Sequence, residues 1–195
     1  MKIAIISDIH ENFHNLGLAL KDIEDRGMEQ ILCLGDLINP GIAQMLVDFS
    51  IPTYMVWGNN DGEKVVITKF SLSKNSHLTV SDATHGFFEA DGKRIFMSHY
   101  PDIARSMAKS GDYDLVAYGH NHEKNTDKIG NCVVINPGEI SAHKTGISSY
   151  AIYNTETNEV EIIVLTNIIS TRTPEVDRCM EEIVDKCKKD DHYKY

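Results

Sequence analysis

The first third of the chain alternates between short apolar runs and longer segments with helical periodicity. Lys2–Ser7, Gln30–Leu34 and Tyr54–Trp57 are apolar runs of strand length. The segments between them carry apolar residues at helical spacing, in Phe13–Ile23 and again in Ile42–Phe49. A repeat of strand and helix predicts parallel strands joined by right-handed crossover connections. Such strands have all of their carboxyl ends at one edge of a sheet.

The rest of the chain predicts antiparallel pairing. Asp91-Gly92 is a favoured two-residue hairpin turn, and polar residues 154–159 separate a second pair of apolar runs. Helices are expected at Glu63–Phe70 and Asp102–Ser110. The strands expected here are 86–90, 93–97, 115–118, 133–136, 150–153 and 160–165. Parallel strands followed by antiparallel ones predict an α/β sandwich of two packed sheets.

Residues that can bind metal follow the predicted strands, at the points where the strands end. Their side chains offer imidazole nitrogens, carboxylate oxygens and one amide oxygen, which are the donors that a pair of borderline transition metals needs. Strand ends at one edge of a sheet can bring them together although they are far apart in the sequence. The seven residues are Asp8, His10, Asp36, Asn59, His99, His120 and His122.

Each of these groups has a simpler interpretation when it is taken alone. The motif Asp8-x-His10 and the run 58–62 are compatible with turns, because Asn, Asp and Gly are favoured turn residues. A lone His99 is more often a surface or core residue than a ligand. The metal interpretation therefore depends on the joint order of all the groups. Among the remaining histidines, His143 lies closest to them in the expected fold, and a surface role is favoured for it.

Composition argues against two other classes of protein. The 195 residues carry a net charge of −10, which disfavours nucleic-acid binding through clustered basic residues. No apolar tract is long enough to cross a membrane, and the N-terminus has no secretory signal, so a cytoplasmic protein is expected. The four cysteines show no CxxC spacing and are expected to be reduced thiols.

The ordered motifs resemble the calcineurin-like metallophosphoesterase superfamily, whose pattern runs D-x-H, G-D, G-N-[HC]-[DE], [GS]-H and G-H-x-H. Within it the chain is similar to the small YfcE-like phosphodiesterases. The resemblance covers residues 1–166 and implies a four-layer α/β/β/α sandwich of two mixed sheets, the metallo-dependent phosphatase fold. Residues 167–195 are expected to form a C-terminal helical extension, partly flexible. Its amphipathic helix at 175–187 would pack on the domain or mediate dimerisation, so a homo-oligomer is possible.

The resemblance divides the seven ligands between two divalent metal ions. It implies that Asp8, His10 and His122 bind one ion. It implies that Asn59, His99 and His120 bind the other, and that Asp36 bridges the two. Mn²⁺ is the first choice, although Fe²⁺, Zn²⁺, Ni²⁺ and Co²⁺ also suit mixed nitrogen and oxygen donors. Asn136-Pro137-Gly138 matches a family segment that lines the site.

The chain departs from the family pattern at three positions near the expected site. Asn60 replaces the usual His or Cys, and it can donate a hydrogen bond but cannot transfer a proton at neutral pH. Glu11 replaces a common Gly, and Glu139 replaces a common Ser. Both extra carboxylates are expected near the mouth of the site, where they would repel a highly charged substrate. The run 35–41 also lacks the Arg that grips phosphate in protein phosphatases of the superfamily, which disfavours a phosphoprotein substrate.

These features predict a phosphodiesterase in which a hydroxide bridging the two metals attacks phosphorus in line. Asp36 is the bridging carboxylate, Asn60 faces the substrate, and Asp61 orients a ligand or Asn60. The expected substrates are small phosphate esters whose leaving groups need little protonation, such as aryl or nucleotide phosphodiesters. The alternative is a non-catalytic interaction scaffold on the same fold, as in the related retromer subunit. The complete set of seven ligands favours the enzyme.

Overall fold

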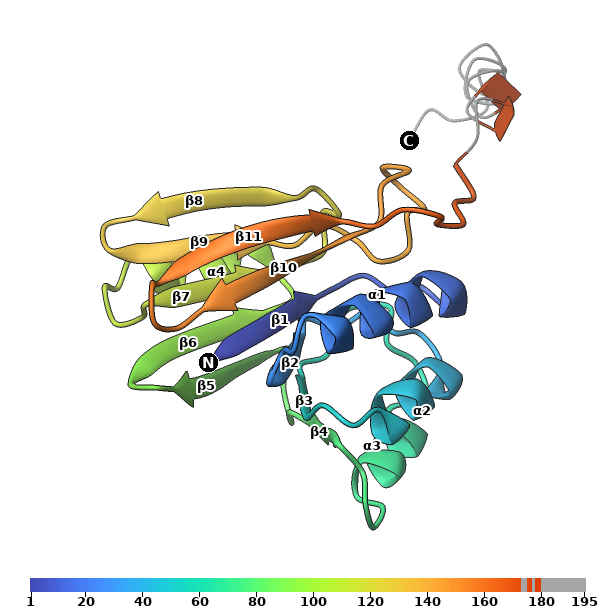
Figure 1. The fold of residues 1–195 in the computed structure, drawn as a ribbon, viewed down its shortest axis with the longest axis horizontal. Helices are drawn as coiled ribbons and strands as arrows, with labels where there is room; N and C mark the ends of the chain where they lie inside the picture. The colour runs from blue at the N-terminus through green and yellow to red at the C-terminus, as the bar shows by residue number, and fades with distance from the viewer. Residues whose placement is uncertain (173–174, 177, 180–195) are drawn as a thin grey trace, which may run out of the picture.

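The computed structural model describes residues 1–172, 175–176 and 178–179, and its body consists of two β-sheets packed face to face (Figure 1). The first sheet has six strands in the order β11 (Glu159–Val164), β10 (Ser149–Asn154), β1 (Lys2–Ile6), β2 (Gln30–Cys33), β3 (Thr53–Met55) and β4 (Leu78–Val80). The second sheet has five strands in the order β5 (His85–Ala90), β6 (Lys93–Ser98), β7 (Leu115–Tyr118), β9 (Cys132–Asn136) and β8 (Asn125–Ile129). Both sheets are mixed, because β1 to β4 and β6-β7-β9 are parallel whereas the other pairs are antiparallel.

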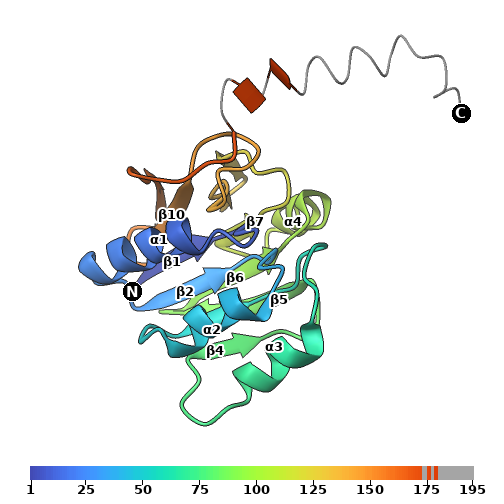
Figure 2. The same ribbon diagram turned by 90° about the vertical axis from the view of Figure 1, so that its right-hand side faces the viewer.

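Helices cover the outer face of each sheet, so the domain has four layers (Figure 2). The first sheet packs against α1 (Phe13–Asp25), α2 (Pro40–Asp48) and α3 (Lys64–Ser71), and the second packs against α4 (Pro101–Ala108). Apolar side chains of the two inner sheet faces form the central core. This arrangement confirms the predicted α/β/β/α sandwich.

Two short strands, β4 and β8, were not predicted from the sequence. β4 has only three residues, and β8 is a polar edge strand in which no residue is fully buried, so neither has the apolar run that would reveal it. β6, β7 and β9 are also parallel, although the second half of the chain was expected to be antiparallel. The helix predicted at 63–70 does form, because burial of Ile67 against the first sheet outweighs the weak helical propensity of its β-branched neighbours.

The chain after β11 contacts the N-terminal end of α1. Ile169 N–H donates to Asn15 Oδ1 at 2.8 Å, and the Ile169 carbonyl accepts from Asn12 and Asn15. Most of the helix predicted at 175–187 lies outside the described residues, and the boundary at 166 stays a prediction. In the part of the chain that the structure describes, no helix has the length and apolar character needed to span a bilayer.

Candidate metal centre

The seven predicted ligands converge at one end of the sandwich, where the parallel strands of both sheets end. Asp8 and His10 follow β1, Asp36 follows β2, and Asn59 follows β3 after a short extension. From the second sheet, His99 follows β6, and residues 120–122 follow β7. The two groups of strand ends face each other across the inter-sheet core. The structure therefore brings the seven side chains together, and their role as metal ligands stays a prediction.

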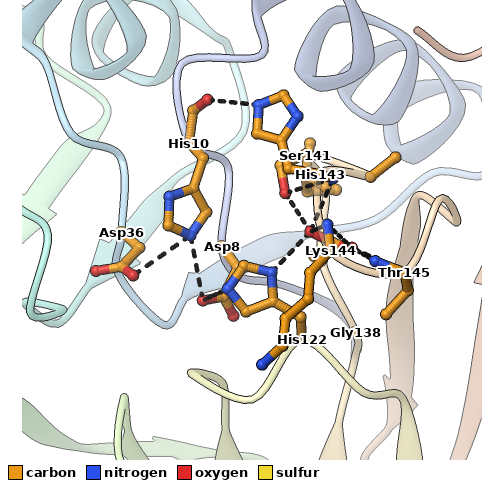
Figure 3. Close-up of polar contacts among 12 residues, drawn as sticks. Asp8, His10, Asp36, His122, Gly138, Ser141, His143, Lys144 and Thr145 are labelled. Atoms are coloured by element: carbon orange, nitrogen blue, oxygen red, sulfur yellow. Dashed lines mark hydrogen bonds and ion pairs between the residues drawn. The ribbon is translucent and has the colours of Figure 1, made fainter. Parts of the chain in front are cut away.

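One half of the cluster consists of Asp8, His10 and His122 (Figure 3). Asp8 Oδ1 lies 3.4 Å from Nε2 of His122 and 3.7 Å from Nε2 of His10. Asp8 Oδ1 and His10 Nε2 are buried and have no hydrogen-bond partner. Because a buried polar atom without a partner is destabilising, these two atoms fit a site that holds a cation between them.

The other half consists of Asn59, His99 and His120. Asn59 Oδ1 lies 2.9 Å from Nε2 of His99 and 2.8 Å from Nδ1 of His120. His99 Nδ1 donates to the carbonyl oxygen of Leu34 at 2.8 Å, which leaves a lone pair on Nε2 of the neutral ring. An amide oxygen and imidazole lone pairs at this spacing suit a divalent cation.

Asp36 lies between the two halves. Its Oδ2 is 3.4 Å from Nε2 of His10 and 3.5 Å from Nε2 of His99. The carboxylate is almost fully buried, and its position is that of a ligand shared by both halves. Its bridging role stays a prediction that this geometry supports.

Glycines next to the ligands allow the carboxylates to pack against the backbone. A Cβ added at Gly58 would lie 2.1 Å from Asp36 Oδ1, and one added at Gly119 would lie 2.0 Å from Ser7 Oγ. The Gly119 position would also be 2.8 Å from Asp8 Oδ2. These distances are far below van der Waals contact, so glycines of the G-N and G-H motifs are required for the packing around Asp8 and Asp36.

The backbone of the ligand loops is strained at several ligands. Asp8, His10, Asp36, His120 and His122 have positive φ angles of 53°, 43°, 58°, 75° and 66°. This left-handed region is unfavourable for residues with a Cβ, although Asp and His tolerate it better than most. Strain of this kind persists only where surrounding contacts over-determine the conformation, as is common in ligand sites.

Asp61 is one of those contacts. Its buried carboxylate accepts from the backbone N–H groups of Gly58, Asp36 and Leu37 at 2.6, 3.0 and 2.6 Å. It thus joins the loop after β3 to the loop after β2. Of the two roles expected for Asp61, these hydrogen bonds favour orientation of the ligand Asp36 over orientation of Asn60.

Asn60 lies against Asp36. Its backbone N–H donates to Asp36 Oδ1 and its side-chain Nδ2 donates to Asp36 Oδ2, both at 2.8 Å. Hydrogen bonds to a charged acceptor are stronger than neutral ones, so this pair fixes the Asp36 carboxylate. The role of Asn60 towards a substrate stays a prediction.

Glu139 does not lie at the mouth of the site, and this expectation is wrong. Its carboxylate is fully buried, accepts from His122 Nδ1 at 2.7 Å, and accepts from the backbone N–H groups of residues 143–145. Burial would raise the pKa of Glu139, but hydrogen bonds from His122, Ser141 and Thr145 outweigh it and hold the pKa at about 2. A buried carboxylate with this many donors is placed to orient His122, which is a predicted ligand. The sequence signal was a charged residue directly after the predicted strand end at 136–138.

Two further residues near the site were considered in the sequence. Glu11 is exposed, and its Oε1 accepts from Nδ2 of Asn39, the residue that caps α2, at 2.7 Å. The expected repulsion of a highly charged substrate by Glu11 stays a prediction. His143 is half-buried, and its Nε2 lies 3.2 Å from the carbonyl oxygen of His10 (Figure 3). Its surroundings therefore differ from the surface role that the sequence favoured.

Opposite charges set the electrostatics of the first half-site. Burial would raise the pKa of Asp8, but its pairing with His10 and the nearby imidazoles lower it below the usual value. Burial would lower the pKa of His10, but Asp8 and Asp36 raise it. Asp8 and His10 thus each stabilise the charged form of the other.

Comparison with known proteins gives the family. The family model of the calcineurin-like phosphoesterase superfamily domain matches residues 1–158, and the chain belongs to this superfamily of hydrolases. Divalent metal ions are implied by the family, and the geometry above fits them.

The relatives are small proteins of the same fold. Phosphodiesterase MJ0936 of Methanocaldococcus jannaschii is 31% identical over 167 residues, which are 85% of this chain and 99% of that protein. A solved structure of an archaeal phosphodiesterase has a TM-score of 0.78 at 30% identity, covering 85% of this chain and 100% of that one. YfcE, a phosphoesterase from E. coli, has a TM-score of 0.62 at 20% identity, with coverage of 85% and 100%.

The fold is shared with proteins of another kind. Vps29 from Entamoeba histolytica, solved as a complex with Zn²⁺, has a TM-score of 0.61 at 16% identity, covering 86% of this chain and 94% of that one. At this identity the similarity concerns the fold alone.

Proposed function

We propose that this phosphoesterase is a two-metal phosphodiesterase that hydrolyses small phosphodiesters. The observation that carries the proposal is the position of Asp36, whose Oδ2 is 3.5 Å or less from ring nitrogens of both half-sites. A single carboxylate oxygen between two sets of lone-pair donors is the arrangement that a bridged metal pair needs. The archaeal relatives are phosphodiesterases, which supports phosphodiesters as the substrate class.

The residues of the chain prepare the site for this reaction. Divalent ions supply positive charge for the phosphate oxygens and make water a better nucleophile. Asp8 and Asp36 provide fixed negative charge, whereas Asn59 contributes a neutral oxygen. Glu139 accepts the Nδ1 proton of His122, and the Leu34 carbonyl accepts the Nδ1 proton of His99. The Nε2 lone pair of each ring is then available to bind a metal ion.

Mn²⁺ is the proposed metal. Mixed oxygen and imidazole donors do not select one ion, and Fe²⁺, Zn²⁺, Ni²⁺ and Co²⁺ also suit them. The donor set has four imidazoles, two carboxylates and one amide, with no thiolate. A metal panel in the activity assay tests this choice.

The proposed substrates have leaving groups that need little protonation. Asn60 cannot supply a proton at neutral pH, and its amide donates to Asp36. Aryl and nucleotide phosphodiesters meet this condition. The absence of an Arg in the sequence of run 35–41 disfavours phosphoproteins.

A scaffold role is the alternative, and the Vps29 fold similarity is its support. Because that Vps29 structure holds Zn²⁺, metal binding alone does not distinguish an enzyme from a scaffold. Turnover of a phosphate ester distinguishes them. The convergence of all seven donor groups, with supporting hydrogen bonds behind His99 and His122, favours the enzyme.

The test is hydrolysis of a bis-aryl phosphate and an aryl phosphomonoester by metal-stripped protein with and without added Mn²⁺. We expect Mn²⁺-dependent turnover with preference for the diester, and its loss in Asp36→Asn. Asp48→Asn is the matched control, because this exposed residue of α2 bonds only to its helix neighbour Gln44 among the contacts described. No metal-dependent turnover on any ester in the panel contradicts the proposal and favours the scaffold.

Three further parts of the proposal concern nucleic acid, oligomeric state and location. We expect no specific binding to nucleic acid, given the net charge of −10. A homo-oligomer is possible, and a cytoplasmic location is expected. Light scattering and cell fractionation test the last two.

A further inference from the structure

The segment 167–172, called the strap below, follows β11 and lies beyond residue 158, where the family match ends. We propose that the strap is a positioning element for the half-site of Asp8, His10 and His122, and that it acts through Thr171 and His143. This inference rests on the proposed two-metal function. It assigns the strap to the active site, whereas the sequence placed residues after 166 in an extension.

Two buried amides hold the strap and the loop 139–145 together. Asn15 Oδ1 accepts from Ile169 N–H at 2.8 Å, and Asn15 Nδ2 donates to the Ile169 carbonyl at 2.9 Å. The same Nδ2 donates to the Ile140 carbonyl at 3.0 Å, while Asn12 Nδ2 donates to the carbonyls of Ser141 and Ile169 at 2.9 Å each. Each amide thus contacts both segments, so movement of the strap disturbs the loop.

Strap residues beyond Ile169 contact the loop directly. Ser170 Oγ donates to the Ala142 carbonyl at 2.5 Å, and Arg172 Nη1 donates to the Lys144 carbonyl at 2.9 Å. Between them, Thr171 Oγ1 lies 2.9 Å from Nδ1 of His143. Three consecutive strap residues therefore contact three consecutive residues of the loop, 142–144, in the same order.

The contacts of His143 fix its tautomer and connect the strap to His10. Nε2 of His143 lies 3.2 Å from the His10 carbonyl, which can only accept, so Nε2 carries the proton (Figure 3). In the tautomer that this contact selects, Nδ1 is the acceptor for the Thr171 hydroxyl, whose Oγ1 lies 2.9 Å away. These two hydrogen bonds hold the backbone of His10, whose φ of 43° lies in the left-handed region. In this conformation Nε2 of His10 lies 3.4 Å from Asp36 Oδ2.

A second path leads from the loop to His122. The backbone N–H groups of residues 143–145 bind the Glu139 carboxylate, which accepts from His122 Nδ1. Both histidines of this half-site are thus supported by the segment that the strap holds. In the other half-site, His120 is reached only indirectly, because Ser141 N–H donates to the Asp8 carbonyl and Asp8 Oδ2 accepts from His120 N–H. None of the described hydrogen bonds of the strap or the loop is made with Asn59 or His99. The strap is therefore expected to affect the half-site of His10 and His122 and not the binding step that depends on Asn59.

The test is calorimetric titration of the metal-free protein with Mn²⁺. His122→Ala and Asn59→Ala first identify which binding step belongs to which half-site. We expect Thr171→Val, which keeps the shape but removes the hydroxyl proton, to weaken the His122-dependent step by up to about 10-fold, as outer ligand supports do. The Asn59-dependent step should stay unchanged, and Thr171→Ser should restore the first step.

His14→Ala is the matched control, because His14 Nε2 contacts the Asn167 carbonyl of the strap at 2.9 Å but is not part of the path through His143. It should leave both steps unchanged. His143→Phe is a second variant that breaks the path at the ring and should reproduce the effect of Thr171→Val. Thermal unfolding without metal shows whether either variant is folded.

Equal weakening of both steps, or a wild-type-like first step in both Thr171→Val and His143→Phe, overturns the inference. If the proposed two-metal function is wrong, the result is different, because the wild-type protein then shows no binding step that Asn59→Ala removes. In that case the effect of Thr171→Val and His143→Phe on the His122-dependent step alone tests the role of the strap.

Discussion

Nδ1 of His122 donates a hydrogen bond across 2.7 Å to Oε2 of Glu139, which is fully buried. This bond fixes the ring so that Nε2 points to Asp8 Oδ1 at 3.4 Å. A carboxylate behind a histidine ligand raises its basicity and selects its tautomer. Glu139 is therefore expected to support the proposed metal centre through His122.

Glu139→Gln is expected to weaken Mn²⁺ binding by about 10-fold or more, as the loss of such partners commonly does. The new amide N–H group would face the donors of the 143–145 loop, so the carboxylate cannot be replaced without loss. Titration calorimetry measures the affinity, and exposed Glu156→Gln is the control. An unchanged affinity in Glu139→Gln contradicts the role assigned to this carboxylate.

Asp61→Asn is expected to lower the free energy of unfolding by about 1–3 kcal/mol, because an amide N–H would face backbone N–H groups now bound by the carboxylate. Urea unfolding in the presence of a chelator measures this without any contribution from metal. Exposed Asp82→Asn should be neutral. If Asp61→Asn leaves stability unchanged but abolishes turnover, Asp61 acts in the reaction and not as a support for the loops.

Gly119→Ala is expected to abolish metal-dependent turnover, because its Cβ would overlap Ser7 Oγ and press on Asp8 Oδ2. Ser7→Ala in the same chain should restore part of the activity by removing one of the two clashes. Gly17→Ala is the control, since its Cβ would meet nothing closer than 4.0 Å. This helical change should raise stability by about 0.5–1 kcal/mol. Full activity in Gly119→Ala shows that the loop tolerates a side chain there.

Asn60→His is expected to raise activity on alkyl phosphomonoesters more than on activated diesters, because an imidazole can protonate a poor leaving group and an amide cannot. The kcat/KM values for matched alkyl and aryl esters measure the difference. Asn60→Gln keeps an amide and should produce no such selectivity. Equal changes on both substrate classes contradict the role of Asn60 in leaving-group preference.

The convergence of the seven proposed ligands was predictable, because each of them follows a strand that the sequence reveals. The apolar runs before Asp8, Asp36 and His99 are buried in the observed sheets, and parallel strands place their carboxyl ends together. The same runs predicted a sandwich of two packed sheets, and the family resemblance implied its four layers. β8 could not be found, since its polar residues at an edge have no apolar pattern.

The supports behind the ligands could not be predicted, because they depend on contacts between distant segments. Whether Glu139 faces solvent or His122 is decided by the loop that wraps around it, and one sequence gives no sign of that loop. The strap depends on Asn15 meeting Ile169, which are 154 residues apart. Polar side chains that bind backbone groups leave no periodic signature.

The central claim is that Asp36 bridges two metal ions, and electron paramagnetic resonance of the Mn²⁺-loaded protein tests it most directly. We expect two bound Mn²⁺ ions per chain and the spectrum of an exchange-coupled pair in the wild-type protein. Asp36→Asn should lose the coupling. A six-line spectrum of isolated Mn²⁺ in fully loaded wild-type protein, unchanged in Asp36→Asn, would contradict the bridged centre.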